Sequence, residues 1–165
     1  MKNHLLAALI LLLTLNGLGQ NQAGQEEKIR SEINDDFQRN LDDCGDEVSA
    51  VTTFNEKTEF WKVCALKNGN RIIQIESYKH DTHFQELYFE KDGMLRYARE
   101  TENYIPTNHF IQMAWNSEFY AENGALISLM SLGHGKTEDD AWNPEIIFEM
   151  HQNRLSELGR ILKVK

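Results

Sequence analysis

Three short turns built on glycine constrain the fold of this chain more than any other feature of its sequence. Asn-Gly or Asp-Gly pairs place glycines at Gly69, Gly93 and Gly124, and aromatic or apolar residues flank each pair. Such pairs adopt the left-handed backbone conformations that the tightest β-hairpin connections require. Their spacing is too uneven for a strict repeat array. The turns therefore predict antiparallel hairpins rather than a repeated binding motif.

Segments with strand-like composition lie on both sides of these turns. They alternate apolar and polar residues or are rich in β-branched residues. Short loops join nearly all of them, and short loops connect antiparallel neighbours. The sequence predicts a meander of about six or seven antiparallel strands, at residues 47–54, 59–67, 70–79, 84–90, 94–101, 110–121 and 125–132.

Two amphipathic helices are predicted, one before and one after the sheet. Residues 25–43 place an apolar side chain at every fourth position, which forms one stripe along a helix. A second helical pattern follows Asn143, which suits a helix cap, and Pro144, which suits a first helical position. The first helix is too short and polar to be stable alone, so its stripe must pack against the sheet. The predicted fold class is α+β, with an N-terminal helix, an antiparallel meander sheet and a C-terminal helix packed on the sheet.

This order of elements resembles the layout of cystatin-like and NTF2-like folds, in which a curved sheet wraps an N-terminal helix. The resemblance concerns topology alone and involves no motif residues. Because such folds host unrelated functions, it implies an architecture and no activity.

The first 19 residues have the pattern of a secretory signal peptide. A lysine precedes an apolar run at residues 5–15, and Gly17 and Gly19 fit the −3 and −1 positions of a signal-peptidase site. The run is shorter than the roughly 20 residues of a membrane-spanning helix. The alternative is an uncleaved anchor. We expect residues 1–19 to be removed, which leaves residues 20–165 as one α+β domain that does not span a membrane and is secreted or periplasmic.

Acidic residues outnumber basic ones. The chain contains 26 Asp and Glu and 17 Lys and Arg, a formal net charge of −9. Nucleic acid is excluded as an expected partner because phosphate binding needs a basic face. Electrostatic steering mildly favours a cationic partner. The simpler interpretation is that acidic side chains keep an exported protein soluble.

Cys44 and Cys64 are the two cysteines of the chain. Export would place them in an oxidising compartment, where disulfides form and persist. We expect them to form a disulfide; the alternative is two buried free thiols. Their spacing is not that of a Cys-x-x-Cys redox motif.

Complete catalytic or metal-binding motifs are not found in the sequence. Residues 135–137, Gly-Lys-Thr, match the end of a phosphate-binding P-loop, but Met130 stands where its first glycine belongs. His80 and His83 lie close together in a predicted turn, yet zinc needs more ligands. The acidic residues 138–140 either complement the dipole of the second helix or contribute to a Ca²⁺ site. The sequence thus predicts no catalytic residue, no cofactor and no metal ligand.

Tyr88 and Tyr97 are the candidates for an exposed binding face. Tyr88 alternates with Glu86 and Glu90, and Tyr97 with Arg99, as on a solvent-facing strand surface. Exposed aromatic side chains suit a peptide, glycan or protein ligand. The alternative is that a helix or the twist of the sheet covers both tyrosines.

Three classes of function remain. The expected one is a secreted or periplasmic, non-enzymatic binding module, such as an inhibitor or an immunity-like protein, whose ligand is an unidentified protein, peptide or glycan of the envelope. The first alternative is an accessory or structural subunit of an envelope assembly, which an uncovered apolar sheet face or an exposed edge strand would favour. The second is a small pocket enzyme, which convergent buried His, Asp or Glu residues would favour.

Overall fold

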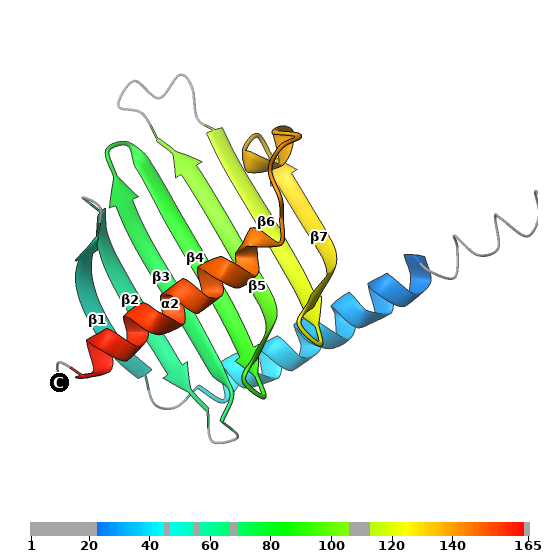
Figure 1. The fold of residues 1–165 in the computed structure, drawn as a ribbon, viewed down its shortest axis with the longest axis horizontal. Helices are drawn as coiled ribbons and strands as arrows, with labels where there is room; N and C mark the ends of the chain where they lie inside the picture. Colours follow the sequence, from blue (N-terminus) through cyan, green and yellow to red (C-terminus); the bar gives the residue numbers. More distant parts are fainter. Residues whose placement is uncertain (1–22, 45–46, 55–56, 67–68, 106–112, 164–165) are drawn as a thin grey trace, which may run out of the picture.

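The middle layer of the protein is a seven-stranded antiparallel sheet. The computed structural model describes residues 23–44, 47–54, 57–66, 69–105 and 113–163. The spatial order of the strands equals their order in the sequence, which confirms the predicted meander (Figure 1). The strands are β1 (Glu47–Phe54), β2 (Lys57–Ala65), β3 (Arg71–Lys79), β4 (Thr82–Lys91), β5 (Met94–Tyr104), β6 (Met113–Glu122) and β7 (Ala125–Gly133).

The glycine turns have the predicted backbone conformation. Asp92 and Gly93 have φ angles of 54° and 75°, and Asn123 and Gly124 have φ angles of 52° and 77°. Gly69 has a φ angle of 82°, whereas its neighbour at position 68 lies outside the described residues. Two consecutive left-handed residues match the twist of the flanking strands, so each pair closes a tight hairpin.

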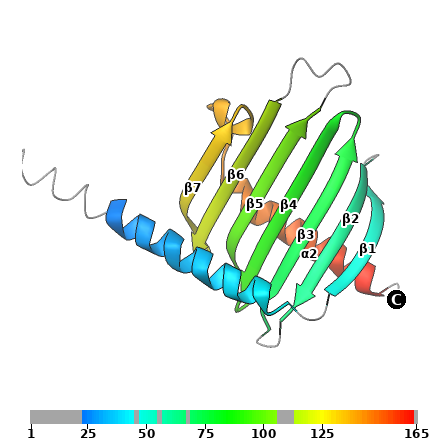
Figure 2. The same ribbon diagram turned by 180° about the vertical axis from the view of Figure 1, so that it is seen from behind.

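The two helices lie on opposite faces of the sheet. The N-terminal helix covers residues 23–42, and α2 covers Ile146–Lys163. Figure 1 shows α2 running diagonally across one face, and Figure 2 shows the N-terminal helix lying across the strand ends on the other. A short 3₁₀ element, η1 (Lys136–Glu138), lies between β7 and α2. The predicted α+β layout is confirmed, with both faces of the sheet in contact with a helix.

The N-terminal helix packs through its apolar stripe. Ile33 and Phe37 are 2% and 5% exposed, and Phe37 meets the rings of Phe89 and Tyr97 at centroid distances of 5.8 and 5.1 Å. Each of these large side chains removes apolar surface from water, which is the main force holding the helix on the sheet.

α2 covers a second core on the opposite face. Its buried residues Ile147 and Leu158 pack over an apolar layer in which Trp61, Tyr88 and Phe119 are at most 2% exposed. Asn143 accepts a hydrogen bond from the backbone N–H of Glu145 at 3.0 Å, as a capping side chain does. The regular helix nevertheless begins only at Ile146, because Pro144 and Glu145 form a turn ahead of it.

The prediction that Tyr88 and Tyr97 form an exposed binding face is wrong. Tyr88 is 1% exposed beneath α2, and Tyr97 is 3% exposed beneath the N-terminal helix. Their charged strand neighbours indicate solvent in the sequence, but Glu86 and Glu90 lie on the same covered face as Tyr88. There Arg154 pairs with Glu86 and Arg71 pairs with Glu90. A strand buried on both faces need not be apolar at every position when its polar groups are paired.

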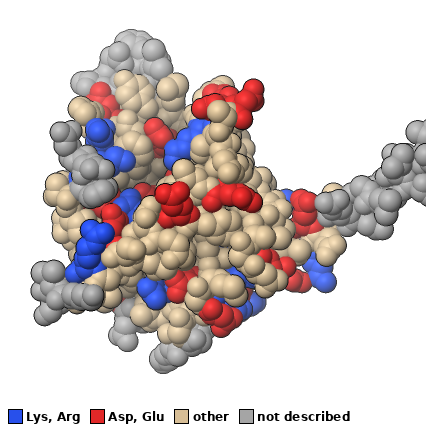
Figure 3. Space-filling view, viewed as in Figure 1, with Lys and Arg blue, Asp and Glu red and all other residues tan. Residues whose placement is uncertain are grey.

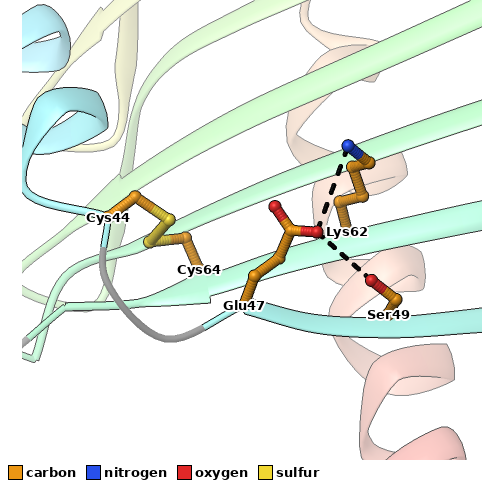
Figure 4. The surroundings of a disulfide bond; sticks show 5 residues. All are labelled: Cys44, Glu47, Ser49, Lys62 and Cys64. Carbon is orange, nitrogen blue, oxygen red and sulfur yellow. Dashed lines mark hydrogen bonds and ion pairs between the residues drawn. A yellow bond between two sulfur atoms is a disulfide. The ribbon is translucent and has the colours of Figure 1, made fainter.

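The predicted disulfide between Cys44 and Cys64 is confirmed. It joins the residues just after the N-terminal helix to β2, and its Cα atoms are 5.8 Å apart (Figure 4). Beside it, Glu47 accepts a hydrogen bond from Ser49 at 3.2 Å and lies 4.0 Å from the ammonium of Lys62. The bridge thus fixes the end of the N-terminal helix to β2, the second strand of the sheet.

The predicted signal peptide, residues 1–19, lies outside the described residues. Within the described part of the chain, no helix is both long and apolar enough to cross a membrane.

Candidate binding groove

Two adjoining pockets run along one side of α2, and Lys57 and Met150 line both of them. The larger, of about 480 Å³, lies between α2 and β2, where Glu59 and Arg154 line it. The smaller, of about 220 Å³, lies over β4, β5 and β6. We call the two together the α2 groove. Acidic and basic side chains are mixed over this face of the molecule (Figure 3).

Arg154 is the centre of charge in the larger pocket. Its guanidinium binds Glu86 in a two-point contact, from Nε at 2.8 Å and from Nη2 at 2.5 Å. It also donates to Glu59 at 3.1 Å and to Glu157 at 2.7 Å, and it lies 5.5 Å from the ring of Trp61. One cation therefore serves three carboxylates, two of which come from the sheet. The planar fork of donors makes arginine suited to this arrangement.

Glu86 is the carboxylate most firmly held. Besides Arg154, it accepts a hydrogen bond from the hydroxyl of Tyr88 at 2.8 Å. Burial alone would raise the pKa of Glu86, but the contacts from Arg154 and Tyr88 outweigh it and lower the pKa below the usual value of 4.5. Glu86 is therefore ionised in the folded protein at neutral pH.

Glu100 forms the floor of the smaller pocket and has a different environment. It is directly opposite Glu86 on β4 and opposite Ser117 on β6. One of its oxygens, Oε1, accepts a hydrogen bond from Lys136 at 2.8 Å. Among the described residues, Oε2 of Glu100 and the hydroxyl of Ser117 have no hydrogen-bond partner, although the two side chains are buried. Buried polar atoms without partners are rare and indicate a missing ligand or water.

The pKa of Glu100 shifts in the opposite direction to that of Glu86. Burial raises it, and the negative charges of Glu86 and Glu102 add to the effect, whereas Lys136 lowers it; the net result is a raised pKa. Two carboxylates directly opposite each other on neighbouring strands repel. Arg154 stabilises the negative charge of Glu86, whereas the negative charge of Glu100 is only partly compensated, by Lys136.

The glycine-rich segment before α2 folds over Trp115 and places Lys136 in the smaller pocket. Gly135 is packed so closely against the indole that a side chain would collide with it. The indole N–H donates to Ser131 at 3.0 Å and to Thr137 at 3.2 Å. The ammonium of Lys136 lies 5.2 Å from the centre of the same ring. Residues 135–137, which match the end of a P-loop in sequence, are thus packed against Trp115. We call these three residues the clasp.

His80, His83 and Glu138, which the sequence brings to attention, are not among the residues that line this groove. His83 stacks on Tyr78 at a centroid distance of 4.5 Å, and His80 occupies the turn between β3 and β4. Glu138 pairs with His134 across residues 135–137, and both side chains are exposed. His109 lies outside the described residues. In the part of the chain that the structure describes, no three His, Cys, Asp or Glu residues are arranged to hold a metal ion.

Sequence reasoning missed the residues that line the groove. Glu59 and Glu86 each precede a buried aromatic residue by two positions, Trp61 and Tyr88 respectively. Side chains two apart on a strand point to the same face. An acidic residue two positions from a core aromatic residue on the same strand therefore indicates a buried carboxylate. The partner of that carboxylate could not be found in the same way, because Arg154 lies 95 residues from Glu59 in sequence.

The sheet face opposite α2 is only partly covered and carries scattered apolar side chains. Val51 and Phe60 are 66% and 45% exposed at one edge, and Leu132 is 77% exposed at the other. Between these edges, the same cross-strand row is filled by polar residues, namely Glu76, Gln85, Thr101 and Asn116. The exposed apolar residues therefore do not form one continuous patch of the kind typical of a stable protein interface.

Comparison with protein-family models, with curated proteins and with solved structures gave no match. The function is therefore argued from the groove alone.

Proposed function

We propose that this chain is an exported, non-enzymatic binding module that holds its ligand in the α2 groove. The observation that carries the proposal is Glu100, which lines the smaller pocket and whose Oε2 is buried without a described partner. The hydroxyl of Ser117, opposite Glu100 on the neighbouring strand, is also buried without a described partner. An unpaired buried polar atom costs about 1–3 kcal/mol, which a bound ligand recovers. The aromatic rings of Trp115 and Phe84 line the same pocket and supply apolar contact area.

Export is part of this proposal and is supported by the disulfide. Bridges between cysteines persist in secreted and periplasmic proteins and are rare where thiols are kept reduced. A protein, peptide or glycan of the envelope remains the class of ligand that the groove would meet there.

The binding proposal is tested by observing the indole N–H of Trp115 by NMR while small probes are added. A panel of alkylamines, alkyl carboxylates and monosaccharides covers the chemistry of the pocket. We expect at least one class to shift the Trp115 signal and to leave the indole of Trp61, which lies under α2, in place. The variant Glu100→Gln should weaken that response, since it removes the charged floor. If no class moves the signal, the pocket is not a binding site and the proposal is wrong.

A small pocket enzyme is the second candidate, favoured by the opposed pKa shifts of Glu86 and Glu100. Environments that push two neighbouring carboxyls apart in pKa are typical of acid–base pairs in catalysis. The binding role comes first because Arg154 and Tyr88 already occupy both oxygens of Glu86, which leaves it poorly placed to act on a substrate.

The opposite pKa shifts of Glu86 and Glu100 give a testable prediction. In a carbon-detected NMR titration, Glu86 should titrate below 4.5 and Glu100 above 4.5, the usual value for both. Because the folded pKa of Glu100 is raised, its ionisation destabilises the protein as pH rises from 4.5 through that pKa. The variant Glu100→Gln should therefore lose less stability than wild type over the same pH range. Coincident titration of the two carboxyls would remove the basis for an acid–base pair.

A further inference from the structure

We propose that the smaller pocket of the α2 groove is a receptor for an alkylammonium group, and that Lys136 fills it in the unliganded protein as a tethered, displaceable occupant. This inference rests on the proposed binding function and names the chemistry of its ligand. The pocket combines a buried carboxylate, Glu100, with the face of an aromatic ring, Trp115.

The contacts of Lys136 show which chemistry the pocket accepts. Its ammonium lies 2.8 Å from Glu100 Oε1 and 5.2 Å from the centre of the Trp115 ring. A carboxylate together with an aromatic face is a typical recognition set for amines, because the ring quadrupole attracts cations. Glu102, opposite Trp115 on the neighbouring strand, adds a second negative charge to the lining. An anion would meet two or more carboxylates here and is disfavoured.

Lys136 does not use every hydrogen-bond acceptor of the pocket. An ammonium has three N–H donors, whereas Lys136 serves a single described acceptor, Glu100 Oε1. Glu100 Oε2 and the Ser117 hydroxyl stay buried without a described partner, on strands that are directly paired. The clasp holds Lys136 at the mouth of the pocket, since Gly135 and Thr137 on either side of it are packed on Trp115. A ligand without this tether is free to enter further and use the remaining acceptor of the lining, Glu100 Oε2.

The occupant is also easy to release. The Lys136 side chain is 40% exposed, while that of Glu100 is 6% exposed. Moving Lys136 into solvent lets its ammonium regain water, and the incoming ammonium replaces it at Glu100. Once the incoming ammonium is bound, the buried carboxylate is paired again, so the complex avoids the large cost of an uncompensated buried charge.

The ammonium has two sources, a free alkylamine or a lysine side chain of a polypeptide. Both present the same group on an alkyl chain, and the pocket continues into the larger one through Lys57 and Met150, which line both. A polypeptide would therefore have room along α2 that a small amine does not use.

The test compares wild type with Lys136→Met by calorimetry and by the Trp115 indole signal. The probes are butylammonium, the anion butyrate, the neutral isostere 1-butanol and the capped tripeptide acetyl-Gly-Lys-Gly-amide. We expect Lys136→Met to bind butylammonium about tenfold more tightly, the factor for a site that is open in about one molecule of ten before the change. Adding Glu100→Gln should abolish the gain. Lys62→Met, which removes an equal charge on the opposite sheet face, should leave the affinity unchanged.

Each outcome decides a separate point. Equal affinity of wild type and Lys136→Met for butylammonium would show that Lys136 is no occupant, and Lys136→Gln provides a second variant for that conclusion. If butyrate or butanol shifts Trp115 and butylammonium does not, the binding function stands and the ammonium assignment is wrong. If no probe binds any variant, both fail. Tighter binding of the tripeptide than of butylammonium supports a polypeptide lysine, and the reverse supports a free amine.

Discussion

At the scale of single residues, the charge beneath α2 depends on Arg154. Its side chain is 14% exposed, and the side chains of its sheet partners Glu59 and Glu86 are 2% and 12% exposed. Burying two carboxylates is costly, and a guanidinium in direct contact offsets that cost. Burial lowers the pKa of Arg154, but hydrogen bonds to Glu86 and Glu157 and the negative charges of Glu86 and Glu59 outweigh it and raise the pKa, so Arg154 stays charged.

Replacing Arg154 should therefore destabilise the fold in a pH-dependent manner. We expect Arg154→Met to lose about 3 kcal/mol of unfolding free energy at neutral pH, because two buried carboxylates lose their cation. The folded pKa of Glu86 is lowered, so its contribution is present above 4.5 and is lost as pH falls through that lower pKa. The difference from wild type should shrink as the solution is acidified. Urea unfolding at several pH values measures it.

Arg160→Met is the matched control for this prediction. Arg160 borders the same groove on α2 and is exposed, so its replacement should change the unfolding free energy by no more than about 0.5 kcal/mol. A loss for Arg154→Met that is equal at acidic and neutral pH would show that packing, rather than charge, is what Arg154 contributes.

At the scale of elements, the two helices are attached to the sheet by partly different means. Both helices combine apolar packing with ion pairs, those of Arg154 for α2 and that of Asp36 with Lys91 for the N-terminal helix. Only the N-terminal helix has a disulfide at its end. The bridge lies immediately after that helix and closes a sequence separation of 20 residues. It restricts the unfolded chain and keeps the helix end next to β2.

Removing the disulfide should loosen the N-terminal helix more than α2. The double variant Cys44→Ser, Cys64→Ser should be less stable by about 3 kcal/mol, as the chain-entropy model gives for a loop of this size. Amide hydrogen exchange should accelerate most in residues 29–41 and least in α2. Adding reductant should reproduce the effect in wild type and have none in the double variant. Uniform acceleration across both helices would contradict the separate attachment of the two elements.

The elements themselves were largely predictable, because their signals are local. The glycine turns, the alternation of the strands and the apolar stripe of Phe37 each occupy a few consecutive residues. The groove was not predictable, because its contacts join residues far apart, such as Glu59 and Arg154 or Glu100 and Lys136. Tyr88 was misplaced for the same reason: whether its face is open depends on where α2 lies, and no local pattern specifies that.

At the scale of the whole molecule, residues 1–19 carry the sequence pattern that predicts where the protein acts. We expect cells that express the full chain to export a form that begins at Gln20, since Gly17 and Gly19 fit the cleavage site. Intact mass and N-terminal sequencing of the protein recovered outside the cytoplasm measure this. Changing Gly19 to Arg should block processing, whereas a full-length product from the wild-type chain would support the uncleaved anchor instead.

The agreement between the strand order and the sequence order has a consequence for how the molecule is completed. Each strand after the first pairs with the strand that precedes it in the chain. During synthesis from the N-terminus, the partner of each new strand is therefore already made, and the sheet can grow by addition at one edge. α2 follows last, and it covers the face that carries Trp61, Tyr88 and Phe119. Until the 18 residues of α2 have been synthesised and packed on the sheet, that apolar surface is exposed to other chains. The final helix therefore sets the length of the period in which a nascent copy is vulnerable to aggregation.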